Sequence, residues 1–152
     1  HGSLSMTIDE IDRSILKLLR QDARLPVSEI ARAIGLSAAP VSRRIERLEK
    51  TGVIRGYTAL IDDQLSGSLE AFTEIRLGGD TETGELAEIV KDVPEVQQLF
   101  TIAGDSDVLV RIRVDDVDHL QQVVNALRRT GKLIGTKTMI VLHTWDRTPN
   151  YE

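Results

Sequence analysis

The periodic run at residues 35–50, GLSAAPVSRRIERLEK, constrains the fold more than any other stretch of this chain. On a helix of ~3.6 residues per turn, Val41, Ile45 and Leu48 fall within about 60° of one another. Ala39, Arg43 and Lys50 point away from that apolar stripe, with Glu46 and Arg47 beside them, and the residues that open the run are small. We therefore predict a helix that buries one face and exposes small and basic side chains on the other.

Two more helices are predicted upstream of this run. A capping-box pattern at Thr7 and Glu10 opens a helix over roughly residues 8–20. A shorter helix follows and ends at Gly35, and Ser37 is a suitable N-cap for the third helix. The order helix, short helix, tight glycine turn, helix predicts a helix-turn-helix. The second helix of that motif enters the DNA major groove.

The outward side of the third helix supplies the predicted DNA contacts. Small side chains at its start let the helix approach base edges closely, and alanine methyls can touch the thymine methyl. Arg43 can reach a guanine edge in bidentate fashion or hold a phosphate, and both roles stay open. The basic residues farther along the helix are better placed for phosphates. The candidate DNA-binding residues are Ser37, Ala38, Ala39, Ser42, Arg43, Arg44, Arg47, Lys50 and Arg55.

The charge distribution separates two halves of the chain. The net charge of −5 argues against a nucleic-acid binder, and a solvated helix whose charges serve solubility is the alternative interpretation. However, residues 1–62 hold 10 basic and 8 acidic side chains, whereas residues 63–152 hold 9 and 16. A weakly basic first half and an acidic second half favour two modules with different partners.

Composition excludes several kinds of site. The chain has no cysteine, which excludes a disulfide framework, a cysteine-ligated zinc site and a thiol nucleophile, and suits a reducing compartment. No apolar run approaches the ~18 residues of a membrane span, and no signal peptide is visible. We therefore expect a cytoplasmic protein without a membrane partner.

The second half of the chain alternates strand and helix patterns. Four residues recur with period two and predict a strand, namely Ala71, Thr73, Ile75 and Leu77. Helix, strand, strand, helix and strand patterns follow, so the order β-α-β-β-α-β predicts a ferredoxin-like arrangement. Two helices would cover one sheet face. The open face is predicted to carry Phe72, Leu109, Met139 and Val141 among polar residues. Packing two such faces together predicts a homodimer.

Composition shifts also suggest the domain boundaries. The segment VIRGYTALID after the third helix is β-prone, and LSGS at residues 65–68 is typical of a linker. The predicted organisation is an expression remnant at 1–5, a helix-turn-helix domain at 6–55, a β-strand linker at 56–68, a βαββαβ domain at 69–148 and a tail at 149–152.

Several motifs carry a resemblance to one family. They are Asp9-Glu10-x-Asp12, Gly35-Leu36-Ser37, Arg43-Arg44-Ile45, Leu48-Glu49 and Gly52-Val53-Ile54-x-Gly56-Tyr57. The first half resembles the winged-helix-type DNA-binding domain of the leucine-responsive regulatory protein/AsnC family of transcription regulators. The second half resembles that family's effector-binding and assembly domain, and the resemblance covers nearly all of residues 6–148. It implies an α+β fold, double-stranded DNA and an amino-acid effector as partners, and dimers that assemble further into an octamer.

The stretch TIAGDSDVLV is the candidate effector site. Gly104 permits positive φ or close approach of a ligand, and Asp105 and Asp107 place two carboxylates in one turn. One interpretation is a hairpin turn whose aspartates accept hydrogen bonds from backbone N–H groups. The family implies another, because its loop usually reads Gly-x-aromatic-Asp and lines the amino-acid pocket between neighbouring dimers. Ser106 departs from that aromatic position.

Within such a pocket, either aspartate would accept hydrogen bonds from the ligand ammonium group. Backbone amides near Gly104 and the hydroxyl of Thr101 would serve the ligand carboxylate, and residues at the start of the last strand would form a second wall. The candidate effector-binding residues are Thr101, Ala103, Gly104, Asp105, Ser106, Asp107, Thr136 and Thr138.

An enzyme is the main rival from another class, and the sequence argues against it. His119 and His143 lack the neighbours of a catalytic arrangement, and no metal-ligand spacing or glycine-rich phosphate loop occurs. We therefore expect neither catalysis, nor a metal, nor a cofactor. A ligand-independent architectural DNA-binding protein of the same fold stays open as the alternative to a regulator with an effector.

Overall fold

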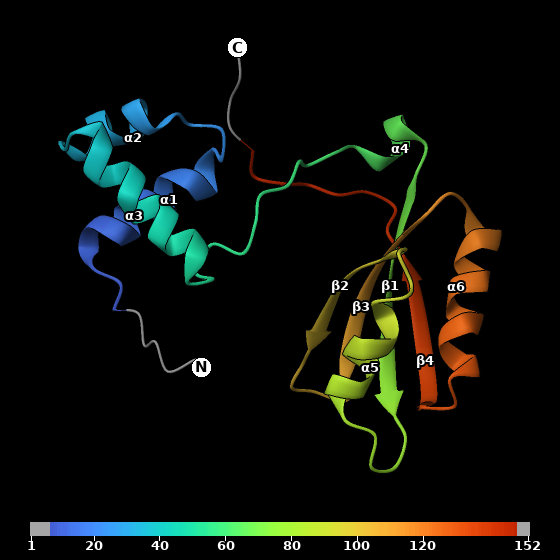
Figure 1. The fold of residues 1–152 in the computed structure, drawn as a ribbon. Helices are drawn as coiled ribbons and strands as arrows, with labels where there is room; N and C mark the ends of the chain where they lie inside the picture. The colour runs from blue at the N-terminus through green and yellow to red at the C-terminus, as the bar shows by residue number, and fades with distance from the viewer. Residues whose placement is uncertain (1–6, 149–152) are drawn as a thin grey trace. The chain divides into compact units, whose positions relative to one another are not determined.

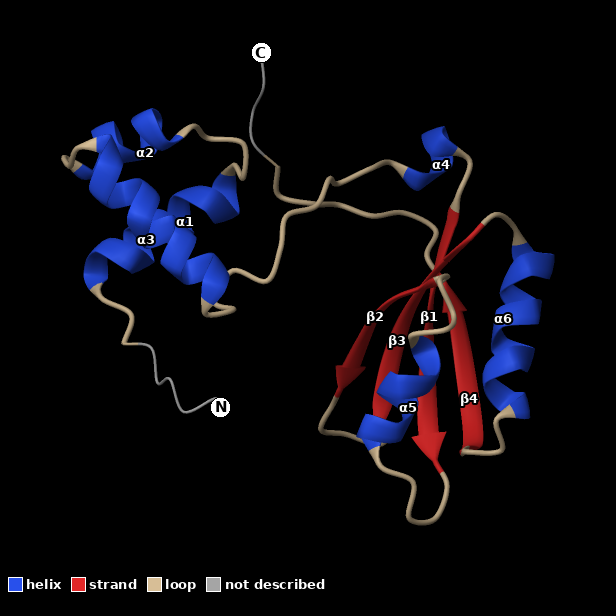
Figure 2. Ribbon diagram, viewed as in Figure 1, coloured by secondary structure: helices blue, strands red, loops and turns tan. Residues whose placement is uncertain are grey.

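The computed structural model describes residues 7–148, which divide into two compact units (Figure 1). Of the described residues, 7–60 and 145–148 belong to one unit and 61–144 to the other. Figure 2 shows helices alone in the first unit and a sheet with helices in the second. The predicted expression remnant at 1–5 and the tail at 149–152 lie outside the described residues.

Three helices form the first unit and confirm the predicted helix-turn-helix. They are α1 (Glu10–Gln21), α2 (Val27–Ile34) and α3 (Ala38–Lys50). Their apolar stripes meet in one core, whose fully or almost fully buried members are Ile15, Ile30, Ala31, Val41 and Leu48. Burial of the four larger side chains, at ~1.5–3 kcal/mol each, compensates for the weak intrinsic stability of an eight-residue helix such as α2.

The turn between α2 and α3 depends on Gly35. Its φ of +83° is the left-handed conformation that favours glycine, and its N–H donates to the carbonyls of Ala31 and Arg32. Ser37 occupies the N-cap of α3 as predicted, although its side chain makes no capping hydrogen bond. The turn therefore sets the direction in which α3 leaves the motif.

The capping box of α1 is not the predicted one. Asp9 is the N-cap, and its Oδ1 accepts from the Asp12 N–H at 2.9 Å while Asp12 Oδ2 accepts from the Asp9 N–H at 3.3 Å. The prediction of Thr7 and Glu10 was therefore wrong by two residues. A carboxylate at the N-cap accepts a charge-assisted hydrogen bond and also complements the positive end of the helix.

The predicted β-strand linker at 56–68 is also wrong. Residues 55–62 contain no strand, and α4 (Asp63–Ser66) follows them, capped by Asp62 and ended by Gly67 at φ +85°. A strand requires a neighbour for its N–H and C=O groups. Among residues 7–148 no segment forms a ladder with 56–62, so β-propensity alone does not make a strand there.

The second unit has the predicted βαββαβ order. Its elements are β1 (Leu69–Leu77), α5 (Thr83–Val90), β2 (Val96–Thr101), β3 (Val108–Val114), α6 (Val117–Arg129) and β4 (Leu133–Ile140). The antiparallel sheet has the order β2-β3-β1-β4. This places the two central strands, β1 and β3, between the edge strands that carry the predicted effector threonines, Thr101 on β2 and Thr136 and Thr138 on β4.

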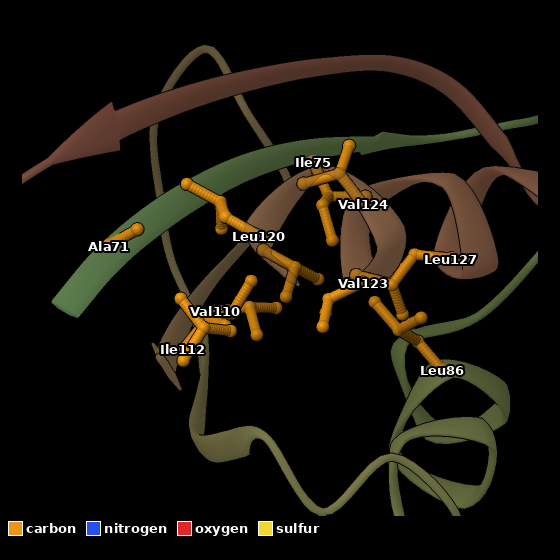
Figure 3. Packing of buried hydrophobic residues seen from close by; sticks show 11 residues of the cluster. Ala71, Ile75, Leu86, Val110, Ile112, Leu120, Val123, Val124 and Leu127 are labelled. Carbon is orange, nitrogen blue, oxygen red and sulfur yellow. The ribbon is translucent and has the colours of Figure 1, made fainter. Parts of the chain in front are cut away.

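Both helices cover the same face of the sheet, because their buried residues share one core with those of β1 and β3 (Figure 3). The period-two pattern of β3 is the clearest case, since Val108, Val110, Ile112 and Val114 are buried while the residues between them are only half-buried. The single buried hydroxyl of this core, on Thr73, lies 3.0 Å from the hydroxyl of Thr138.

The opposite face of the sheet carries apolar side chains among polar ones, as predicted. Phe72 of β1 lies directly opposite Met139 of the adjacent strand β4, as expected for an apolar patch. Beside it, Glu70 Oε2 lies 3.2 Å from Arg111 Nη1 and 3.4 Å from Arg113 Nη2. The open face therefore combines an apolar patch with a half-buried ion cluster.

Candidate functional site

The exposed side of α3 begins with small side chains. Ser37, Ala38, Ala39 and Ser42 are all exposed, and Pro40 lies in the first turn. Because nothing bulky projects from this turn, another molecule can approach the backbone at the start of α3 closely. This is the part of the helix that the helix-turn-helix motif presents to base edges.

Arg43 is the basic residue of α3 with the greatest freedom to bind a partner. It is exposed, and within residues 7–148 it makes neither a hydrogen bond nor an ion pair. All five N–H donors of its guanidinium are therefore available, in the planar fork that matches a guanine edge or a phosphate.

Arg44 and Arg47 are arranged differently, because both contact α1. Arg44 Nη1 lies 2.7 Å from Asp9 Oδ2 and 3.1 Å from Asp12 Oδ1, and Arg47 Nη2 lies 3.2 Å from Asp12 Oδ2. The side chain of Asp12 has no exposed surface, while that of Asp9 is half exposed. These ion pairs hold α3 against α1 and orient two of the predicted phosphate ligands.

Electrostatics within this cluster favours the charged forms. The backbone N–H of Asp12, followed by the Arg44 guanidinium, lowers the pKa of Asp9 to about 2. Hydrogen bonds to Asp9 and Asp12 raise the pKa of Arg44. Sequence reasoning proposed no role for Asp9 or Asp12 beyond the family motif. The signal was present, since both the aspartates and the arginines are spaced three residues apart on helices that pack together.

The remaining candidates for DNA contacts lie toward the end of α3 and beyond it. Lys50 Nζ lies 2.9 Å from Glu46 Oε1, and this pairing raises the pKa of Lys50 and lowers that of Glu46. Both side chains are largely exposed, so the pair exchanges readily with solvent or with another anion. Arg55 is exposed just after the helix.

The loop between β2 and β3 is anchored to β1 by Asp107. The Asp107 N–H donates to the Ile75 carbonyl at 3.0 Å, and Asp107 Oδ2 accepts from the Leu77 N–H at 2.9 Å. This second bond lies at the register shift between Arg76 and Leu77. Asp107 therefore fits the interpretation of a hairpin turn whose aspartates accept hydrogen bonds from backbone N–H groups. The N–H group that it binds belongs to Leu77 of β1, however, and not to the turn itself.

Asp105 differs from Asp107 in having no such bond. Its side chain is exposed, and within residues 7–148 it makes no hydrogen bond or ion pair. The neighbouring Gly104 has φ of +157°, close to extended, and a Cβ placed on it would meet no atom within 4 Å. A carboxylate without a partner thus lies beside open space, which makes Asp105 the better placed ligand acceptor of the two.

The threonine candidates do not come together within one chain. Thr101 pairs with Val108, Val108 with Ile75, and Ile75 with Thr136, so the four residues form one row across the sheet. Three strand spacings separate Thr101 from Thr136, which is about 14 Å. One amino acid cannot contact both threonines across that distance. Thr138 already shares its hydroxyl with Thr73.

Residues 7–148 contain no helix that is long and apolar enough to cross a membrane. These residues also include no group of three or more His, Asp or Glu side chains placed to hold a metal ion.

Known families and structures match both units. Residues 8–55 match the family described as winged helix-turn-helix DNA-binding, and residues 70–151 match the Lrp/AsnC ligand binding domain. HTH-type transcriptional regulator FL11 of Pyrococcus abyssi is 32% identical, over 95% of this chain and 96% of its own. The leucine-responsive regulatory protein of Klebsiella pneumoniae is 34% identical, over 89% of this chain and 85% of its own.

Solved structures agree with this assignment along nearly the whole chain. The feast or famine regulatory protein from M. tuberculosis, complexed with L-methionine, has a TM-score of 0.80 at 30% identity. The match covers 92% of this chain and 95% of that one. The relatives are transcriptional regulators and not enzymes, which confirms the expected absence of catalysis. The chain therefore belongs to the Lrp/AsnC family, as a transcriptional regulator with a helix-turn-helix DNA-binding domain and a ligand-binding domain.

Proposed function

We propose that α3 reads the DNA major groove with its first turn and with Arg43. Ser37, Ala38 and Ala39 would approach base edges, and Ser42 would contact a base or a phosphate. The observation that carries this proposal is that Arg43 is exposed and has no partner within residues 7–148, on the outward side of the second helix of the motif. The phosphate ligands in this proposal are Arg44, Arg47, Lys50 and Arg55.

We further propose that an amino acid is the effector of this protein. Two neighbouring structures, from M. tuberculosis and from Neisseria meningitidis, are complexes with L-methionine. In this chain Asp105 would bind the ligand ammonium group, and the backbone around Ala103, Gly104 and Ser106 would bind its carboxylate. Asp107 would contribute indirectly, because it holds the loop between β2 and β3 against β1.

The distance between the threonines constrains this site. Because Thr101 and Thr136 lie about 14 Å apart, they would line the same pocket only if different copies of the chain supplied them. Thr138 would join Thr136 on that second wall. We therefore propose that the effector binds between chains, and that this is how a ligand changes assembly.

Self-association of the second unit is part of the same proposal. The apolar patch on the open sheet face includes Phe72, Leu109 and Met139, and Met139 is 41% exposed. We propose a homodimer through this face and assembly of dimers into an octamer. Two recognition helices would then be separated by ~34 Å or a multiple of it, which fits a palindromic operator.

The experiment that tests the function combines DNA binding with ligand screening. Operator sequences are selected from a random duplex library, and affinity is then measured with each of the twenty amino acids. A ligand at ~100 times its dissociation constant also stabilises the fold by ~2.7 kcal/mol, which is visible as a melting shift. The proposal is supported if the protein binds a specific operator sequence and one amino acid changes its affinity for that operator. Binding without any ligand response favours the architectural alternative, and sedimentation with and without ligand tests the assembly.

A further inference from the structure

A depression on the outward side of α3 brings three guanidinium groups together. It has a volume of about 300 Å³ and is lined by Pro40, Arg43, Arg44 and Arg47. These residues follow one another at intervals of three, one and three positions, so they share one side of the helix. Arg43 and Arg47 form a like-charge pair one turn apart, which is unfavourable unless an anion lies between them.

Arg44 and Arg47 use only part of their hydrogen-bonding capacity on α1. Arg44 makes all its bonds to Asp9 and Asp12 through Nη1, and Arg47 bonds to Asp12 through Nη2. A guanidinium has five N–H donors in a fixed plane. Within residues 7–148, therefore, Nε and Nη2 of Arg44 and Nε and Nη1 of Arg47 donate no hydrogen bond.

The charges around the depression do not cancel. Three guanidinium groups face two carboxylates, and one of these, Asp12, is fully buried behind Arg44 and Arg47. The accessible side of the cluster is therefore positive, with planar donors already oriented by the carboxylates behind them. An oxyanion that accepts several N–H bonds suits this arrangement better than a base edge does, because its charge balances the surplus.

We propose that this depression binds one phosphate of the DNA backbone, with Asp9 and Asp12 as positioning residues that orient Arg44 and Arg47. Each of these arginines bridges α1 at one end of its guanidinium and the phosphate at the other. Arg43 closes the open side of the site. This inference rests on the DNA-binding function proposed above and assigns Arg44 and Arg47 a joint role.

An exchange of arginine for lysine keeps the positive charge but removes the second set of N–H donors. It therefore tests whether Arg44 binds α1 and the phosphate at the same time. Lysine has one ammonium nitrogen, and at position 44 the carboxylates of Asp9 and Asp12 would hold it, so that the phosphate contact is lost. Arg128→Lys is the matched control, because the same exchange then occurs at an exposed position of α6, outside the DNA-binding unit. Affinity for a random-sequence duplex is measured at several salt concentrations, and melting checks that each variant is folded.

For Arg44→Lys we expect the slope of log affinity against log salt to become shallower by ~1. The loss of affinity between roughly 50 and 200 mM salt is then about 3.5-fold smaller than for the wild type. Arg128→Lys should keep the wild-type slope. A wild-type slope for Arg44→Lys, or an equal change in both variants, overturns the phosphate site and leaves DNA binding intact. Salt-independent or absent binding by the wild type overturns the proposed function itself.

A second measurement uses the wild-type protein and needs no variant. Inorganic phosphate is titrated into protein labelled with ¹⁵N, and the arginine Nε–H signals are followed by NMR. We expect shifts at Arg43, Arg44 and Arg47, with Arg128 and Arg129 at the end of α6 as internal references. Shifts of equal size at all arginines overturn the site, even where Arg44→Lys is poorly folded.

Discussion

Each unit holds a candidate site in place with an aspartate, but the two aspartates have different surroundings. Asp12 is fully buried and lies between two arginines of α3. Asp107 is exposed and accepts a hydrogen bond from the backbone N–H of Leu77. Removing a buried charge partner leaves uncompensated charges, whereas removing an exposed acceptor leaves a group that water can satisfy. The DNA-binding unit should therefore be the more sensitive of the two to a single substitution.

Replacing Asp12 by alanine should have the largest effect. It removes a partner of Arg44 and Arg47 and part of the α1 capping box. Both arginines stay partly exposed to water, so we expect a loss of about 2–3 kcal/mol from the cap and the charge-assisted hydrogen bonds. Amide hydrogen exchange in α1 and α3 measures this loss separately from the second unit. Asp105→Ala is the control and should stay within about 0.5 kcal/mol of the wild type. Unchanged protection of α1 in Asp12→Ala would contradict the structural role of the cluster.

Replacing Arg43 by alanine should weaken DNA binding by about 1–3 kcal/mol without changing stability. If Arg43 contacts a base, the loss is confined to the cognate operator and specificity relaxes. If it contacts a phosphate, the loss is the same for all sequences. Anisotropy titrations on several operator variants distinguish the two roles, and an unchanged affinity would remove Arg43 from the interface.

Replacing Asp107 by alanine should cost about 1 kcal/mol, because the N–H of Leu77 loses its acceptor in a partly solvated position. Effector response should fall with it, since the loop loses its anchor on β1. Asp105→Ala should lose the effector response at full stability. Urea denaturation and melting with the effector amino acid measure both effects. A normal ligand response in Asp105→Ala would reject its proposed contact with the ammonium group.

The smallest effect concerns pH and His119. Its Nε2 lies 2.8 Å from Glu95 Oε2, and this hydrogen bond, with the charges of Glu95, Asp115 and Asp116, raises the pKa of His119. The stabilisation is fully present below the unfolded pKa of ~6.5 and is lost as pH rises through the higher folded pKa. The Asp115 N–H donates to Nδ1, so protonation gives up one bond and limits the gain.

Unfolding of the second unit between pH 5 and 8 tests this, with His119→Asn as the variant. The wild type should lose stability relative to this variant as pH rises. Parallel profiles of the two proteins would show that the pair contributes nothing to stability.

Periodicity along the sequence was enough to predict most of the fold. The apolar stripe at Val41 and Leu48, and the alternation through β1 and β3, each report burial on one face of a local element. The failure of the strand prediction in the linker has a non-local cause. The linker pattern at 56–62 is β-prone, but a strand also depends on a neighbour, which local propensity does not supply.

The candidate sites divide in the same way. That Ala39 and Arg43 are exposed followed from helix geometry alone. That Arg44 is bonded to Asp9, 35 positions away, did not. The distance between Thr101 and Thr136 likewise follows only from the order of the strands in the sheet. Nothing in the sequence around either threonine indicates that β2 and β4 are the two edge strands.

The sequence by itself determined which segments are helices and strands, how they follow one another, and which family the chain resembles. Residue spacing and turn residues act locally, so they can be read one segment at a time. Only the tertiary structure decided which charges are neutralised, which donors remain available, and which of two neighbouring aspartates anchors the loop. Those outcomes depend on contacts between residues 30 or more positions apart, such as Asp107 with Leu77 and Arg44 with Asp9.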